Sequence, residues 1–271
     1  MDTKQQLKGS DFFADHPVFS LDEAVKALAG DGGRSRVVER LKYHIKTGRL
    51  KRVAREVYAV IATGVPAENF RPDPFMVAKA MHPGGVFSHH SALELLGAAY
   101  SVWNQCTLYV SGRRRPLLLG GFVVRFLDSP PSMQAGPEKQ VGTRRVERRG
   151  MLLETTGPER TLVEGFNRPS LAGGLEELVR SAAGFTTLDL DLLEEVLHRY
   201  NLARLWATTG WFLERFQKSF HVPDTLLSRM EERCPRSRFY AERGRRGGAL
   251  VRRWNLILPQ TLLSLEEPDE R

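Results

Sequence analysis

A dense group of Lys and Arg residues between positions 34 and 60 is the part of the sequence best suited to bind a polyanion. It holds nine basic residues against Glu39 and Glu56, so it carries most of the formal net charge of +8. Its basic members are Arg34, Arg36, Arg40, Lys42, Lys46, Arg49, Lys51, Arg52 and Arg55. Such side chains bind DNA phosphates regardless of base sequence, and arginine can also read a guanine edge. This chemistry predicts binding to duplex DNA.

Residues 34–60 are expected to carry these side chains on one helix and one short hairpin. Apolar residues recur at the spacing of a buried helical face: Val37, Val38, Leu41 and Ile45. Ser35 is the expected N-cap of this helix, and Gly48 follows where the helix would end. Two β-prone runs on either side of residues 54–56 then predict a hairpin. A helix, a glycine stop and a hairpin form the second half of a winged helix.

The exposed face of this helix is expected to enter the major groove, which is about 12 Å wide. The hairpin is expected to lie along the phosphates. The helical residues predicted to bind DNA are Arg34, Ser35, Arg36, Arg40, Tyr43, Lys46 and Thr47. The hairpin residues predicted to bind DNA are Arg49, Lys51, Arg52 and Arg55. The alternative is a solvated basic surface, and the attached hairpin favours DNA binding over it.

The neighbouring sequence predicts an α+β chain, with an N-terminal winged helix-turn-helix domain over residues 1–62. Ser20 and Glu23 form a capping box that opens the preceding helix. Residues 63–74 are rich in Pro and form the expected linker. Residues 75–271 are expected to form a larger, mixed α+β domain, because short helical and strand patterns are mixed along it.

Within the second domain, the patterns predict helices at 75–81, 172–183, 189–200 and 203–219. A further helix is expected to begin after Ser88 as N-cap and to end at Gly97, and another begins at Gly157-Pro158. The predicted strands are 86–87, 107–111, 122–127, 151–154 and 254–258. Residues 129–150 are expected to be irregular.

Composition limits the class of protein. The chain has 271 residues with 41% hydrophobic and 27% charged residues, as is usual for soluble globular proteins. No run of 18 apolar residues is present, and the polar N-terminus does not resemble a signal peptide, so a cytoplasmic location without membrane contact is expected. Cys106 and Cys234 stand alone, which excludes a disulfide framework or zinc finger, and both are expected to be buried and inert.

Three other groups of residues could do chemistry, and each is better explained structurally. His89 and His90 are adjacent and point about 100° apart on a helix, so they cannot grip one metal ion. Asp189 is a better helix N-cap than a member of a metal-binding Asp-x-Asp pair. Arg160 and Glu164 are spaced to pair across one helical turn. We therefore expect neither a catalytic set, nor a metal site, nor a cofactor.

The C-terminal region contains a second concentration of arginines, which suggests contact with DNA or with an acidic protein surface. The residues assigned to partner binding are Arg233, Arg236, Arg238, Arg243, Arg245 and Arg246. A solvated surface is the alternative.

Four segments in order resemble the AbiEi family of antitoxins and autorepressors of type IV toxin–antitoxin systems. They are LKRVAREVYAV (50–60), VFSHHSALELLGA (86–98), TGPERTLVEGF (156–166) and LAGGLEELV (171–179). The resemblance covers most of residues 15–200. Glu56 stands where the family usually has Gly, and Glu164 where it usually has Asp.

The resemblance implies a repressor that binds inverted repeats in its own promoter. It also implies an antitoxin that counteracts an AbiEii-like, nucleotidyltransferase-like toxin, without enzymatic activity of its own. The alternative is a nucleic-acid-processing enzyme, nuclease- or nucleotidyltransferase-like, that a winged helix delivers to its substrate. A Gly-Ser phosphate loop, which a nucleotidyltransferase would need shortly before Asp189, is missing from the sequence.

Overall fold

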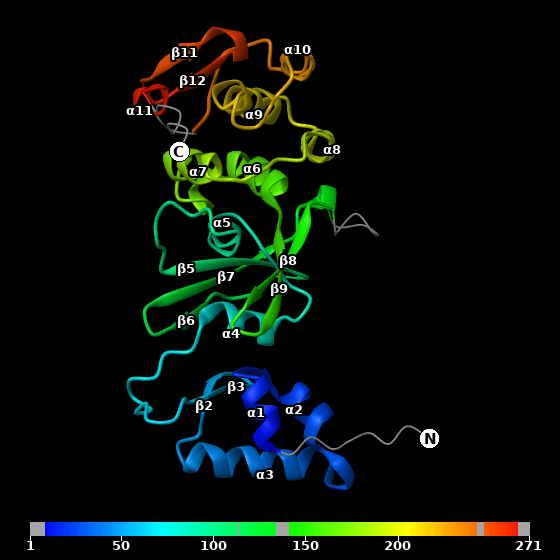
Figure 1. Ribbon diagram of the computed structural model, residues 1–271, viewed down its shortest axis with the longest axis vertical. Coiled ribbons are helices and arrows are strands. Elements are labelled where there is room, and N and C mark those ends of the chain that lie inside the picture. Colours follow the sequence, from blue (N-terminus) through cyan, green and yellow to red (C-terminus); the bar gives the residue numbers. More distant parts are fainter. Residues whose placement is uncertain (1–8, 113, 134–140, 243–246, 265–271) are drawn as a thin grey trace.

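The computed structural model describes residues 9–112, 114–133, 141–242 and 247–264. Three units follow one another along its long axis (Figure 1): an N-terminal unit of residues 9–60, a central six-stranded sheet, and C-terminal helices with a small sheet. Helices mixed with parallel and antiparallel strands place the protein in the predicted α+β class. In these ranges, no helix has the length and apolar character needed to cross a membrane.

The N-terminal unit packs three helices against a three-stranded antiparallel sheet. The helices are α1 (Gly9–Asp15), α2 (Leu21–Leu28) and α3 (Gly33–Lys46). The strands are β1 (Val18–Ser20), β2 (Leu50–Ala54) and β3 (Val57–Val60), in the order β1-β3-β2. The predicted capping box of α2 is confirmed, because Ser20 Oγ accepts the Glu23 N–H and the Glu23 carboxylate accepts the Ser20 N–H.

Two details of α3 correct the prediction. The helix begins at Gly33 with Gly32 at the N-cap, so Ser35 lies inside the first turn and does not cap it. Ile45 is 37% exposed, whereas His44 packs edge-on against Phe13 at 5.0 Å between ring centroids. A helix of 3.6 residues per turn brings position 44 closer than position 45 to the buried stripe.

The central sheet has the strand order β6-β7-β5-β4-β9-β8. Its strands are β4 (Val86–Phe87), β5 (Gln105–Val110), β6 (Leu117–Leu119), β7 (Phe122–Asp128), β8 (Thr143–Arg148) and β9 (Met151–Thr156). Parallel pairs (β7 with β5, β4 with β9) alternate with antiparallel ones. The prediction of irregular structure at 129–150 is wrong for β8, which pairs with β9 along its whole length.

Helix α4 (Pro74–Met81) lies between the N-terminal unit and the central sheet. Phe75 and Ala78 belong to the core under the sheet. Met76, Val77 and Ala80 instead pack in a cluster with residues of β1 and β3. The two units are therefore joined by apolar packing on both faces of α4, and not by the Pro-rich segment alone.

The C-terminal helices form the largest hydrophobic core, together with Trp254. They are α6 (Pro158–Asn167), α7 (Leu175–Ala183), α8 (Leu190–Tyr200), α9 (Ala203–Arg215), α10 (Asp224–Glu232) and α11 (Gln260–Leu263). Helix α5 (His90–Leu95) lies beside the central sheet and contributes Leu93 to the same core. A small sheet of β10 (Phe239–Tyr240), β12 (Leu256–Leu258) and β11 (Ala249–Val251) follows. The expectation that Ser88 caps α5 is wrong, since His89 occupies the N-cap.

Candidate nucleic-acid interface

Helix α3 lies at the end of the molecule farthest from the C-terminal helices (Figure 1). Val37 and Leu41 are 2% and 1% exposed and fasten one face of α3 to the core that contains Phe12, Phe13 and Phe19. The opposite face is exposed, as predicted, and consists of Arg36, Glu39, Arg40, Tyr43, Lys46 and Thr47. Tyr43, at 63% exposed, is the largest apolar surface on this helix. The helix therefore presents a basic, partly aromatic face to solvent.

Arg34 is also exposed, but its guanidinium is held by two carboxylates. Nη1 donates to Asp22 Oδ1 on α2, and Nη2 donates to Glu56 Oε1 at the hairpin tip, both at 2.8 Å. The bond to Asp22 is the main reason why the pKa of Arg34 is raised. Of the predicted DNA-binding residues, Arg34 thus lies apart from the open face of α3.

The basic residues of the β2–β3 hairpin have different environments. The Arg49 guanidinium lies over the Phe13 ring, 5.1 Å from its centroid. Lys51 Nζ donates to the carbonyls of Ala67 and Phe70, at 3.0 and 3.4 Å, and so ties β2 to the segment before α4. Arg52 and Arg55 are exposed. The side chains of Arg49, Arg52 and Arg55 are therefore exposed to solvent, whereas Lys51 fastens β2 to the segment before α4.

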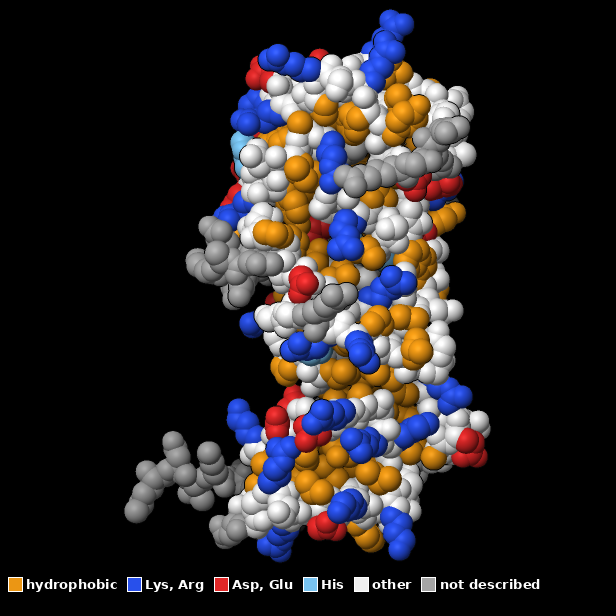
Figure 2. All heavy atoms as spheres, turned by 180° about the vertical axis from the view of Figure 1, so that it is seen from behind, with side chains coloured by type: hydrophobic (Ala, Val, Ile, Leu, Met, Phe, Trp, Pro, Cys, Tyr) orange, Lys and Arg blue, Asp and Glu red, His pale blue; other side chains and the backbone are white. Residues whose placement is uncertain are grey.

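A view from the opposite side shows several Lys and Arg side chains over the N-terminal unit, around a patch of hydrophobic side chains (Figure 2). On α3 itself, Lys42 Nζ binds Glu39 Oε1 at 2.7 Å, so part of this charge is neutralised locally. Exposed pairs of this kind contribute little to stability.

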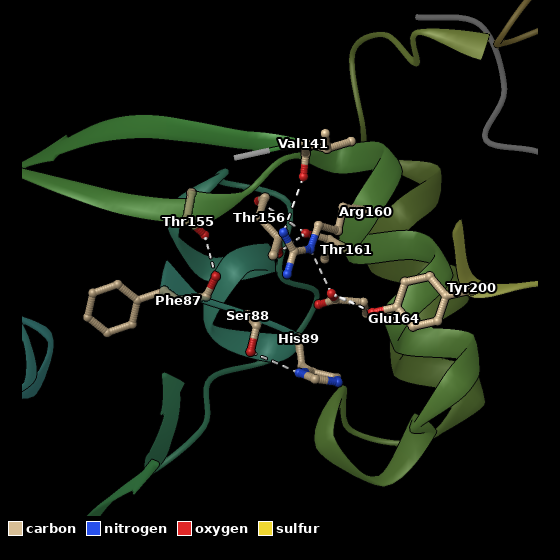
Figure 3. A network of polar contacts seen from close by, with 10 residues as sticks. All are labelled: Phe87, Ser88, His89, Val141, Thr155, Thr156, Arg160, Thr161, Glu164 and Tyr200. Atoms are coloured by element: carbon tan, nitrogen blue, oxygen red, sulfur yellow. Dashed lines mark hydrogen bonds and ion pairs between the residues drawn. The ribbon is translucent and has the colours of Figure 1, made fainter. Parts of the chain in front are cut away.

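The segments VFSHHSALELLGA and TGPERTLVEGF meet in a buried polar network between the sheet and α6 (Figure 3). The predicted pair is confirmed: Arg160 Nε donates to Glu164 Oε1 at 2.7 Å, and both side chains are at most 2% exposed. The Tyr200 hydroxyl donates to the same oxygen at 2.8 Å. This network lies inside the molecule, where a nucleic acid cannot reach it.

His89 and His90, which the sequence predicts not to bind a metal ion together, are both buried. Burial, with the nearby Arg168 and Arg160, lowers the pKa of His89 to about 3, so its ring is neutral at physiological pH. His90 stacks on Trp103 and contacts Glu177 Oε1 at 3.3 Å. Within the residues that the structure describes, no group of three His, Cys, Asp or Glu residues is arranged to hold a metal ion.

Two smaller predictions are also resolved. Asp189 is the N-cap of α8, since its Oδ1 accepts the Leu192 N–H at 3.0 Å, which confirms the structural interpretation. Cys106 is buried as expected, whereas Cys234 is only partly buried. Burial raises the pKa of both thiols.

The C-terminal arginines are only in part a free basic surface. The Arg233 guanidinium lies over Trp206, 4.9 Å from the ring centroid, and Arg253 bridges Glu214 and Glu231. Arg236 and Arg238 are exposed. Arg243, Arg245 and Arg246 lie outside the described residues.

Comparisons with known proteins bear on the fold. No protein-family model and no curated protein matches the chain. The crystal structure of the RV2827C protein from Mycobacterium tuberculosis matches 91% of this chain and 88% of that chain, with a TM-score of 0.58 and 16% identity. Similarity at this level of identity concerns the fold alone. The chain therefore has an overall fold similar to that of the RV2827C protein.

Proposed function

We propose that this chain is a transcriptional repressor that binds duplex DNA by placing α3 in the major groove. The proposal rests on one observation: α3 carries an exposed face with Arg36, Arg40 and Lys46 at the free end of the molecule. The order helix, strand, helix, helix and hairpin supports assigning the N-terminal unit to the winged helix-turn-helix class. Exposed Arg49, Arg52 and Arg55 on the adjoining hairpin would add phosphate contacts.

Binding to its own promoter is the first expected result. A duplex from the region upstream of the gene should bind about 10³-fold more tightly than a random duplex of equal length at physiological salt. Log affinity should fall linearly with log salt, because bound cations are released from the phosphates. Gel-shift titrations at several salt concentrations measure both quantities. Equal affinity for the two duplexes would refute sequence-specific repression.

We further propose that the protein is the antitoxin of a type IV toxin–antitoxin system, acting against an AbiEii-like nucleotidyltransferase-like toxin. The support is the resemblance of the four ordered segments to the AbiEi family. Two of these segments build the buried network of Figure 3, which suggests that they maintain the fold and leave partner contacts to the surface. Exposed Arg236 and Arg238 are the candidates for such a contact.

Co-expression with a nucleotidyltransferase-like neighbouring gene tests the antitoxin role. The full chain should restore growth, and the double substitution Arg236→Ser/Arg238→Ser should reduce this rescue. Arg125→Ser, which removes an exposed arginine from β7, is the matched control and should rescue like the wild type. Failure of the full chain to rescue would rule out neutralisation of that toxin and leave DNA binding untouched. Rescue by the double variant would exclude Arg236 and Arg238 as the contact.

A further inference from the structure

We propose that Arg34 does not contact DNA but is a positioning residue that fastens the hairpin tip to the N-terminal ends of α2 and α3. This inference rests on the proposed function. Its two ion pairs join Asp22 on α2 and Glu56 at the tip to the first turn of α3. One side chain therefore connects the three elements whose relative placement decides how α3 meets a groove.

The backbone at the tip supports the same role. Only Arg55 and Glu56 separate β2 from β3, so the turn at the hairpin tip is tight. Glu56 adopts φ = 57°, a left-handed conformation that side chains other than glycine seldom take. Its carbonyl accepts the Leu21 N–H at 2.7 Å, and its carboxylate binds Arg34. Glu56 thus keeps a strained turn in place through contacts that a glycine could make only in part.

The two carboxylates argue against a phosphate contact by Arg34 itself. Asp22 and Glu56 bind the two terminal nitrogens of the Arg34 guanidinium. A DNA phosphate that approached Arg34 would also meet both carboxylates. Arg36 and Arg40, farther along the exposed face, are better placed to receive DNA.

The substitution Glu56→Gln in the full-length protein distinguishes two roles of the Glu56 carboxylate, because they predict opposite changes in DNA affinity. If the carboxylate merely repels DNA, its removal should raise affinity for the promoter duplex. If it holds the tip through Arg34, its removal should lower affinity, by about threefold because exposed pairs are weak. Glu39→Gln is the matched control, since it removes an exposed carboxylate from α3 without touching the tip, and should raise affinity.

Arg34→Gln provides the second arm of the test. A positioning residue predicts about threefold weaker binding with the salt slope unchanged, and no further loss when Glu56→Gln is added. A phosphate contact predicts a slope lower by about 0.9. Tighter binding by Glu56→Gln, or a lower slope for Arg34→Gln, would overturn the proposal.

A measurement without DNA separates this inference from the proposed function. Arg34→Gln should speed amide hydrogen exchange at Leu21, whose N–H donates to the Glu56 carbonyl at the tip. The exchange rate of Leu41, in the core, should stay unchanged. Unchanged exchange at Leu21 would show that Arg34 does not hold the tip. A wild type that binds no duplex specifically would refute the proposed function even where Leu21 exchange responds as expected.

Discussion

Arg36→Ala and Arg40→Ala are each expected to weaken binding to the promoter duplex by about 1–3 kcal/mol, the range for loss of a bidentate contact to guanine. Both side chains are exposed on the face of α3 opposite the buried Val37 and Leu41. Since they contribute little to the core, the variants should fold normally. The loss of binding free energy should be greater for the cognate duplex than for a random one, because each arginine is expected to contact one particular base pair.

Gel-shift titration against the promoter duplex, single-base variants and a random duplex measures this effect. Each arginine variant should no longer discriminate between bases at one position of the site. Arg125→Ala, on the central sheet, is the control and should keep both affinity and selectivity. A uniform loss on all duplexes would make Arg36 and Arg40 phosphate contacts, and no loss on any would remove α3 from the interface.

Local periodicity predicted the N-terminal elements well because their signals are local. The Ser20–Glu23 capping box and Gly48, at φ = 73°, needed no distant contact to be interpreted. Serine is the better intrinsic N-cap, so the sequence predicts that α3 begins after Ser35. In the structure the glycine-rich segment before Ser35 leads directly into the helix, which begins at Gly33. The sequence does not predict strand β8, because its many basic side chains are not typical of a strand. The strand gains its stability from pairing with β9.

The exposure of the basic face of α3 was predictable from the sequence, but the contacts of the individual basic residues were not. Arg34 meets a carboxylate 12 residues upstream and another 22 residues downstream. Lys51 reaches carbonyls 16 and 19 residues away, and Arg233 lies on a tryptophan from another helix. Such contacts depend on how helices and strands pack, which residue type and spacing alone do not specify. Counting basic residues therefore overestimated the charge available to a partner.

Glu164→Ala is expected to cost about 3–5 kcal/mol of stability, the largest effect of any single substitution considered for this chain. Glu164 and Arg160 are 1% and 2% exposed, so the substitution leaves a buried guanidinium without its carboxylate. Arg160 Nη1 would keep a bond to the Val141 carbonyl at 3.2 Å, which cannot neutralise the charge. The Tyr200 hydroxyl would also lose its acceptor.

Urea denaturation of the two variants Glu164→Ala and Glu195→Ala tests this prediction within one protein. Glu195 pairs with Arg199 at the same spacing of four residues and a similar distance, 2.7 Å, but is 48% exposed. Its loss should cost about 0.5 kcal/mol, as for other exposed helical pairs. Replacing both buried partners, by Arg160→Met with Glu164→Leu, should recover most of the loss, since the buried guanidinium is then removed together with its carboxylate. Equal costs for Glu164→Ala and Glu195→Ala would mean that water reaches Arg160 and that the network of Figure 3 does not stabilise the junction of sheet and helices.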